Sequence, residues 1–284
     1  MRRSGRRIQG PSAPTRLWNG AAVHLADEGV STLPKVFVHG NPETAAVWDP
    51  LLTELGRAGS LRAELICLSP PGFGAPLPAG FEATVGEYRD WLIGELERFG
   101  EPVDLVGHDW GGAHVVNVAV SRPELLRSWA SDVVGVFDAD YVWHEIARRW
   151  QTPGEGEADV AARFGAAVQT RASALVKGGM SRDVAERIAP ALDETMGRAV
   201  LALYRSASQP VLAQLGRDLE RAAQRPGLAL LATEDHMVGT EEQRRRAARR
   251  AGARIEVLDG LGHWWMAQDP ERGARALTTF WAQC

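Results

Sequence analysis

The sequence predicts an α/β fold with a mainly parallel sheet, flanking helices and one inserted helical segment. Short apolar segments rich in β-branched residues recur along the chain, and helical segments separate them. The strand pattern then stops over residues 136–218, where only helical patterns follow one another. A chain of 284 residues, of which 45% are hydrophobic, is long enough for one large domain of this kind with an insertion.

Seven segments have the composition of buried strands. They cover residues 21–25, 35–38, 64–68, 103–106, 128–133, 228–231 and 254–258. The stretch SPPGFGAPLPAGF is rich in Gly and Pro, which predicts a loop after the third of these strands. We therefore expect residues 21–135 and 219–284 to form the α/β core.

The inserted segment contains three amphipathic helical patterns. They are DYVWHEIARRW, ADVAARFGAAVQTRASALV and SRDVAERIAPALDETMGRAVLALYRSA. An all-helical insertion between two strands of such a sheet predicts a cap over residues 136–218. The arginine cluster at residues 244–250 is interpreted as the exposed face of a core helix.

Composition argues against several classes of protein. A net charge of -4 and a pI near 6.0 give no reason to expect a nucleic acid or an anionic membrane as partner. The Arg-rich residues 1–20 precede no apolar segment, so we expect a basic tail and neither a secretory nor a twin-Arg signal. With two cysteines and no apolar run of membrane-spanning length, the sequence favours a cytoplasmic monomer or homodimer without cofactor or metal.

The stretch VDLVGHDWGGAHVV has the pattern Gly-x-nucleophile-x-Gly, with Asp109 at the nucleophile position. An apolar strand precedes it and a helix is predicted to follow, which is the context that this sharp turn requires. The glycines fit a strained backbone and close packing, and the helix dipole favours a negative charge at position 109. The alternative is an aspartate that only caps the helix.

Two later segments offer partners for such a nucleophile. ATEDHMVG follows a predicted strand and offers Asp235 as an acid, and LDGLGHWWMAQDP offers His263. The order nucleophile, acid, histidine is the one expected of an α/β-hydrolase. Asp132, near the end of the strand before the insertion, and Glu234 are the alternatives for the acid.

Four segments together carry a family resemblance: FVHGNPE, SPPGFGAP, GHDWGG and GHWWMAQDPER. They resemble the haloalkane dehalogenase and epoxide hydrolase branch of the α/β-hydrolase superfamily. The resemblance extends over the predicted core, whereas in the insertion only ALYRS, around Tyr204, is similar. It implies an enzyme with an aspartate nucleophile that acts on a small apolar organic substrate.

The chemistry of a carboxylate explains why an aspartate would stand at this position. A carboxylate with an ordinary pKa of roughly 3.9 is ionised at neutral pH and attacks an sp3 carbon without a base. The product is an alkyl-enzyme ester on Asp109, and His263, held by Asp235, would activate water against it. Backbone N–H groups of Trp110 and Asn41 would hold the oxyanion.

The leaving group has two leading interpretations. The resemblance implies that Asn41 and Trp110 bind halide, which needs fixed N–H donors. An epoxide needs an acidic O–H instead, and Tyr204 resembles the second lid tyrosine of epoxide hydrolases, with Tyr141 or His144 as substitutes for the first. The sequence thus favours cleavage of a carbon–halogen bond, with epoxide hydrolysis as the alternative. Ester or lactone hydrolysis and binding without turnover stay open.

Overall fold

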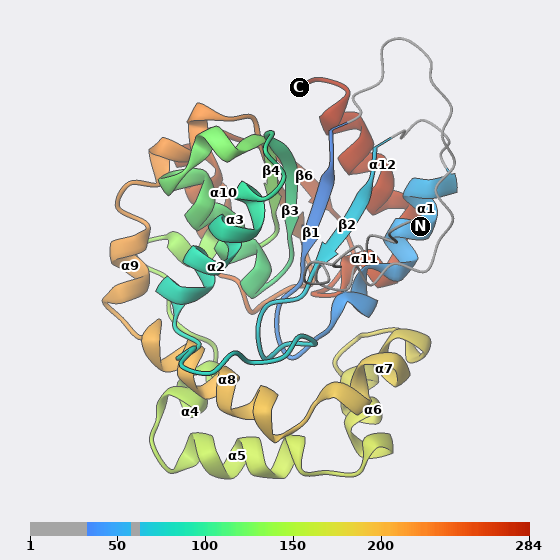
Figure 1. Ribbon diagram of the computed structural model, residues 1–284, viewed down its shortest axis with the longest axis vertical. Helices are drawn as coiled ribbons and strands as arrows, with labels where there is room; N and C mark the ends of the chain where they lie inside the picture. Colours follow the sequence, from blue (N-terminus) through green and yellow to red (C-terminus); the bar gives the residue numbers. More distant parts are fainter. Residues whose placement is uncertain (1–32, 58–62) are drawn as a thin grey trace, which may run out of the picture.

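The computed structural model describes residues 33–57 and 63–284, and these contain a six-stranded parallel sheet in the order β2-β1-β3-β4-β5-β6 (Figure 1). The strands are β1 (Lys35–Val38), β2 (Leu65–Leu68), β3 (Val103–Gly107), β4 (Leu126–Ser131), β5 (Gly227–Ala232) and β6 (Ala253–Leu258). The predicted α/β class is confirmed, and these strands match six of the predicted segments. The segment predicted at residues 21–25 lies outside the described residues.

Strand β4 ends earlier than its predicted range of 128–133. Its pairing with β3 ends at Ser131, opposite Gly107, so Asp132 and Val133 lie beyond the sheet. The prediction ran too far because Val133 continues the apolar pattern into the next turn. Asp132 therefore stands on the loop at the carboxyl end of the sheet, beside the turn that follows β3.

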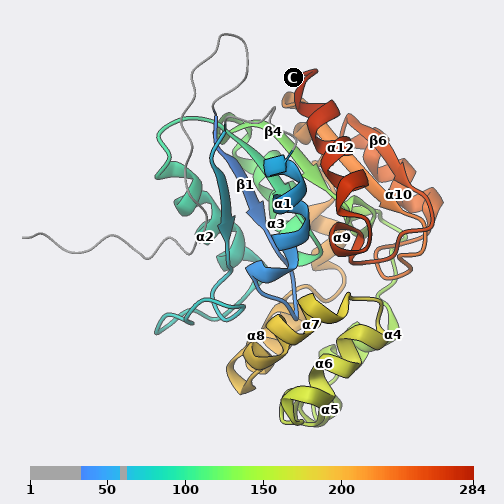
Figure 2. The ribbon, with the colours of Figure 1, turned by 90° about the vertical axis from the view of Figure 1, so that its right-hand side faces the viewer.

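Helices cover both faces of the sheet. They are α1 (Asp49–Arg57), α2 (Val85–Glu97), α3 (Trp110–Ser121), α10 (Glu241–Arg250), α11 (Trp265–Gln268) and α12 (Pro270–Trp281). Helix α1 packs against α12 and α2 packs against α3, and Figure 2 shows α2 and α12 on opposite sides of β1. Apolar side chains of the strands are thereby buried on both faces, as parallel sheets require.

The strand order identifies where a ligand site is expected. From β1 the chain crosses to β2 on one side and then to β3 on the other side, so the direction of winding reverses between β1 and β3. In open parallel sheets, ligands bind outside the carboxyl ends of the strands at such a reversal. The loops that follow β1 and β3 carry Asn41 and Asp109.

The insertion is helical throughout its regular structure, but with more helices than the sequence patterns indicated. They are α4 (Glu145–Gln151), α5 (Glu155–Phe164), α6 (Val168–Lys177), α7 (Arg182–Ile188), α8 (Glu194–Ser206) and α9 (Val211–Leu215). Gly165 ends α5 and Pro190 interrupts the third predicted helix, because both residues disfavour a helix interior. Figure 1 shows α4 to α8 as a layer at one end of the sheet.

The interpretation of residues 244–250 as an exposed face is wrong at Arg244. This side chain is only 5% exposed, and Ala247 and Ala248 share its inward face. Positions three and four apart lie on one side of a helix, so packing of the two alanines carries Arg244 inward. Within the described ranges, no helix is long and apolar enough to cross a membrane.

Candidate active site

Asp109 occupies a strained turn between β3 and α3, with φ of 50° and ψ of -129°. Neighbouring glycines allow the turn to pack closely: a Cβ at Gly111 would lie 2.1 Å from the Val38 carbonyl oxygen. A Cβ at Gly40 would lie 2.2 Å from Asp109 Oδ1. The strain is typical of functional turns, and it lifts the carboxylate above the ends of the strands.

The Asp109 carboxylate is held by the loop after β1. The backbone N–H of Asn41 donates to Asp109 Oδ1 at 2.9 Å. Burial raises the pKa of Asp109, whereas the charges of His263 and His108 lower it. Trp110 begins α3, so its N–H is one of the groups that a helix start leaves without a helical partner. The structure thus brings both residues expected as oxyanion donors, Asn41 and Trp110, next to Asp109, and the bond from Asn41 is formed.

Asp235 holds His263 beside this carboxylate. Asp235 Oδ2 accepts a bond of 2.8 Å from His263 Nδ1, and Oδ1 accepts one of 2.9 Å from the Met237 N–H. His263 Nε2 lies 3.8 Å from Asp109 Oδ2. Burial opposes protonation of His263, but the charge and hydrogen bond of Asp235 raise the pKa to about 9. Burial likewise opposes ionisation of Asp235, and His263 brings that pKa to about 2.

The two alternative acids lie elsewhere. Asp132 accepts hydrogen bonds from the Asp109 N–H at 3.1 Å and from Trp265 Nε1 at 2.7 Å, and it contacts His108 Nδ1 at 2.5 Å. The Glu234 side chain is 63% exposed and faces His236, at 4.0 Å. Asp132 therefore supports the turn that carries Asp109, and only Asp235 among the three acids contacts His263.

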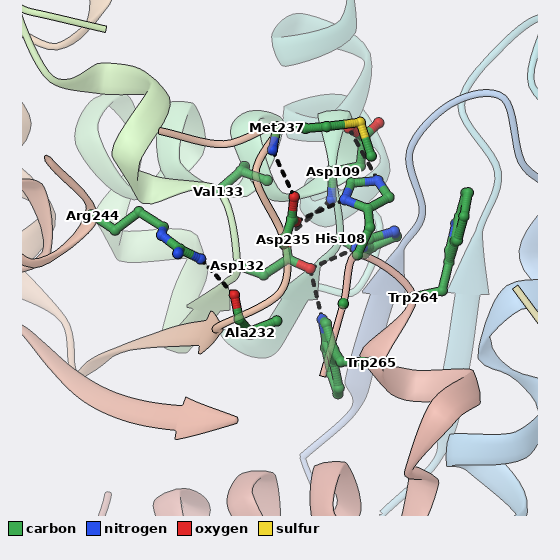
Figure 3. A network of polar contacts seen from close by, with 12 residues as sticks. His108, Asp109, Asp132, Val133, Ala232, Asp235, Met237, Arg244, Trp264 and Trp265 are labelled. Carbon is green, nitrogen blue, oxygen red and sulfur yellow. Dashed lines mark hydrogen bonds and ion pairs between the residues drawn. The ribbon is translucent and has the colours of Figure 1, made fainter. Parts of the chain in front are cut away.

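A buried charged network beneath the site was not foreseen from the sequence (Figure 3). His108 lies between Asp132 and Glu43, with Nε2 at 3.1 Å from Glu43 Oε1. Burial opposes its charge, but Glu43 and Asp132 raise the pKa of His108 well above its usual range. Trp264 Nε1 also donates to Glu43. Glu43, His108 and Trp264 lie in the motif segments FVHGNPE, GHDWGG and GHWWMAQDPER, which indicates that they are near the site but not that they contact one another.

Glu43 also approaches His263. Its side chain is fully buried, and its Oε2 has no hydrogen-bond partner among the described residues. One ligand atom from each of Glu43, His108 and His263 lies within 4.8 Å of the others. His263 Nδ1 is hydrogen-bonded to Asp235, so the other ring nitrogen, Nε2, is available for a further hydrogen bond. Glu43 and His263 are thus neighbours on the same side of His108.

The other side of Asp109 carries the leaving-group candidates. The Tyr204 ring lies 5.3 Å from the Trp110 ring, edge to face. Burial and the charge of Asp109 raise the pKa of Tyr204 well above its usual range, and the side chains of Trp110 and Asn41 partly offset this. The Asn41 residue is 5% exposed, and neither atom of its amide has a hydrogen-bond partner among the described residues. N–H and O–H groups thus gather beside Asp109, and within the described part of the chain the Asn41 amide is unsatisfied.

Tyr141 and His144 both line the small cavity beside Asp109, but their polar atoms differ in availability. The Tyr141 hydroxyl donates to the Met237 carbonyl at 2.8 Å. His144 Nδ1 accepts from the Ala147 N–H at 3.2 Å, so the neutral ring carries its proton on Nε2. Burial lowers the pKa of His144 to about 4, so this ring stays neutral at physiological pH.

The cavity itself is narrow. It measures about 20 Å³, close to the space that one water molecule needs. Trp110, Trp143 and Tyr204 form much of its wall, and the two indole rings are stacked with centroids 5.8 Å apart.

The fold and this site define an α/β-hydrolase. The model of the Alpha/beta hydrolase family matches residues 36–276, and the chain belongs to this family. That range contains Asp109, Asp235 and His263.

Curated relatives are similar over part of their length. The chain is 26% identical over 151 residues to (E)-2-((N-methylformamido)methylene)succinate hydrolase of Acinetobacter baylyi, covering 52% of this chain and 55% of that protein. It is 34% identical over 115 residues to an epoxide hydrolase of Caballeronia sordidicola, covering 39% and 33%. It is 25% identical over 159 residues to a haloalkane dehalogenase of Bradyrhizobium diazoefficiens, covering 49% of each. The matches thus span about half or less of these relatives.

Solved structures are similar over almost the whole chain. A haloalkane dehalogenase from Bradyrhizobium elkani has a TM-score of 0.67 at 21% identity, covering 90% of this chain and 92% of that one. Epoxide hydrolase A from Mycobacterium thermoresistibile has a TM-score of 0.68 at 20% identity, with the same coverage. At these identities the likeness shows the fold alone.

Proposed function

We propose that this α/β-hydrolase uses Asp109 to displace a leaving group from an sp3 carbon and then hydrolyses the resulting alkyl-enzyme ester. The observation that carries the proposal is the position of the Asp109 carboxylate between the Asn41 N–H, at 2.9 Å, and His263 Nε2, at 3.8 Å. An aspartate placed there has a donor for the future oxyanion and a base for water. A helix-capping residue would need neither.

The first step forms the ester. Asp109 Oδ2 attacks the carbon, and the bond from carbon to the leaving group breaks with its electron pair. Oδ1 keeps the hydrogen bond from the Asn41 N–H and becomes the carbonyl oxygen of the ester. The charge on Asp109 is lost in this step. Because that charge helps to raise the pKa of His263, the pKa of the histidine falls when the ester forms.

The second step breaks the ester. Water between His263 Nε2 and the ester gives its proton to the histidine and attacks the carbonyl carbon. Glu43 Oε2 has no partner among the described residues and is available to accept a hydrogen bond from the other O–H of this water. The Asn41 N–H stabilises the oxyanion, which contributes roughly 3 kcal/mol in comparable sites. Collapse expels the alcohol with the proton from His263 and leaves the second water proton on the new Asp109 carboxyl group. Loss of that proton to solvent regenerates the Asp109 carboxylate.

For the leaving group we favour halide from a short haloalkane. Among the described residues, neither amide atom of Asn41 has a partner at hydrogen-bond geometry, although the side chain lies close enough to the Tyr204 hydroxyl to lower its pKa. An unsatisfied buried polar group costs about 1–3 kcal/mol, and a halide that accepts its N–H would remove that cost. The cavity beside Asp109 holds about one water molecule, so a haloalkane would enter only when the surrounding rings move apart.

Epoxide hydrolysis is the second candidate, and a specific observation favours it. Tyr204 and His144 both line the cavity, and each carries a proton that can reach an oxygen there: the phenol O–H and the imidazole Nε2–H. The loss of charge on Asp109 also lowers the pKa of Tyr204 at the moment when an alkoxide needs its proton. A His–Tyr pair would thus replace a pair of tyrosines, since the Tyr141 hydroxyl is engaged by Met237.

Trapping the ester tests the proposal. A panel of haloalkanes and epoxides is assayed for halide and diol release, and the best substrate is given to His263→Ala. We expect the intact mass to rise by the alkyl group, localised to Asp109, while hydrolysis stops. In wild type, a single turnover in heavy-oxygen water should give a first product with ordinary oxygen. Labelled first product, together with turnover by the His263 variant, would exclude the ester mechanism. A protein that turns over no member of the panel would point to ester cleavage or binding alone.

A further inference from the structure

Arg244 is a buried cation that the proposed reaction does not use. Its side chain is 5% exposed, and among the described residues no carboxylate lies within ion-pair distance of it. Its Nε has no hydrogen-bond partner in the described part of the chain. A charge in this position is costly unless nearby charges or fixed dipoles compensate it. The surroundings of Arg244 must therefore supply charges or dipoles that offset this cost.

The contacts of Arg244 lead to the turn that carries the catalytic acid. Its Nη1 donates to the carbonyl oxygen of Ala232, the last residue of β5, at 2.7 Å (Figure 3). The same oxygen accepts the backbone N–H of Asp235 at 3.2 Å. Arg244 and Asp235 are thus joined through one peptide oxygen. The stem of Arg244 packs on Gly135, where an added Cβ would lie 2.6 Å from Arg244 Cγ.

We propose that Arg244 is a positioning residue for the Asp235–His263 pair: it fixes the turn that holds Asp235, and its charge weakens the hold of Asp235 on the histidine proton. The proposal rests on the proposed function, in which His263 must lose that proton before it can activate water. It assigns no direct contact between Arg244 and the substrate.

The sign of the electrostatic effect follows from the charges around each group. Burial lowers the pKa of Arg244, and Asp235 provides the largest opposing charge, followed by Glu241; Arg245 and Asp132 also act on it. A guanidinium remains protonated under these conditions. Its positive charge disfavours a second positive charge on His263 and offsets part of the negative charge of Asp235. Both effects lower the pKa of His263.

Other charges around His263 set the background for this effect. Asp235 and Asp109 favour the protonated ring, whereas the protonated His108 disfavours it. Glu43 and His144 also lie close enough to interact with His263. None of these groups is altered when Arg244 is replaced. A change at Arg244 therefore reports on its own contribution.

The experiment is a histidine titration by NMR in the resting protein, with the His263 signal assigned from His263→Asn. Arg244→Gln keeps a donor for the Ala232 carbonyl and removes the charge, and Arg244→Lys keeps the charge. Arg245→Gln, on the exposed side of the same helix and paired with Glu241, is the matched control. We expect the Gln variant to raise the pKa of His263 by about half a unit to one unit, and the Lys and control variants to change it much less.

A second readout needs the substrate. In Arg244→Gln, the acidic limb of the single-turnover hydrolysis rate should move to higher pH by a similar amount, with the alkylation rate little changed. If the Gln variant does not fold, Arg244→Met provides a neutral side chain with an apolar stem. A folded neutral variant whose His263 titrates as in wild type would overturn the proposal. Because this titration needs no turnover, that result is distinct from a failure of the proposed function, in which no substrate is hydrolysed.

Discussion

Replacing Asp235 by Asn should separate the two half-reactions. The variant removes a charge and a hydrogen bond that raise the pKa of His263 from 6.5 to about 9, a change of roughly 3 kcal/mol. Burial and the charge of His108 would remain, and both lower this pKa. The Asp109 charge would also remain and raises this pKa, but it is a smaller influence than burial. We therefore expect the pKa of His263 to fall below 6.5 in Asp235→Asn. Loss of the orienting carboxylate should slow ester hydrolysis by about 10³- to 10⁴-fold, by analogy with other triads.

The same variant should lose stability in a defined pH range. The pKa of Asp235 is lowered from 3.8 to about 2 in the folded protein. Its contribution to folding stability is therefore present above pH 3.8, the pKa in the unfolded chain, and is lost as pH falls toward 2. The raised pKa of His263 gives a contribution that is full below 6.5 and is lost as pH rises through about 9. The destabilisation by Asp235→Asn should thus be largest near pH 5–6 and smaller above pH 9, as urea unfolding at the two pH values would measure.

Rapid quench followed by intact-mass measurement is the kinetic assay. Wild type should show little alkyl-enzyme, whereas Asp235→Asn should accumulate it at an almost unchanged rate of formation. Asp132→Asn is the control, since Asp132 accepts the Asp109 N–H and should affect alkylation instead. Hydrolysis within tenfold of wild type in the Asp235 variant, with hydrolysis abolished in the Asp132 variant, would refute the assignment of the acid.

Three further predictions concern the nucleophile and its leaving group. If halide leaves, Asn41→Ala and Trp110→Phe should each slow alkylation by about tenfold to a hundredfold, the loss of a hydrogen bond to a charged group, and bromide should quench Trp fluorescence less in Trp110→Phe. A large loss in Tyr204→Phe alone, with fluorescence indifferent to halide, would favour the epoxide. Gly40→Ala should abolish alkylation, because its Cβ would lie 2.2 Å from Asp109 Oδ1; an active variant would show that the carboxylate can move. The pH limb of ester hydrolysis should lie below the resting His263 pKa of about 9, because the ester lacks the Asp109 charge; coincident values in single-turnover and NMR titrations would contradict this.

Much of the fold was predictable because its signals are local. Alternation of apolar strands and helices predicted the sheet, and the glycines around Asp109 predicted a sharp turn at the end of β3. The residues expected as acid and base, Asp235 and His263, also lie next to each other. Each of these inferences depended only on where a predicted strand ends and on the order of the residues along the chain.

The remainder depends on contacts between distant segments. Glu43 and Asp132 meet on the two sides of His108, although 43 and 132 are far apart in the chain. Nothing in the local sequence indicates that pairing. In the sequence, Arg244 does not differ from the other arginines of residues 244–250. Only the packing of α10 against the short 3-10 helix at Val134–Phe137 makes Arg244 a buried residue.

The groups on the leaving-group side come from two parts of the chain. Asn41 and Trp110 follow strands of the sheet, whereas His144 and Tyr204 belong to the helical insertion at α4 and α8. On the proposed chemistry, anion binding and proton donation are thus encoded in separate stretches of one gene. Recombination of the stretch that encodes the insertion with that of a relative would exchange the proton donors and leave Asp109 and its ester-cleaving partners intact.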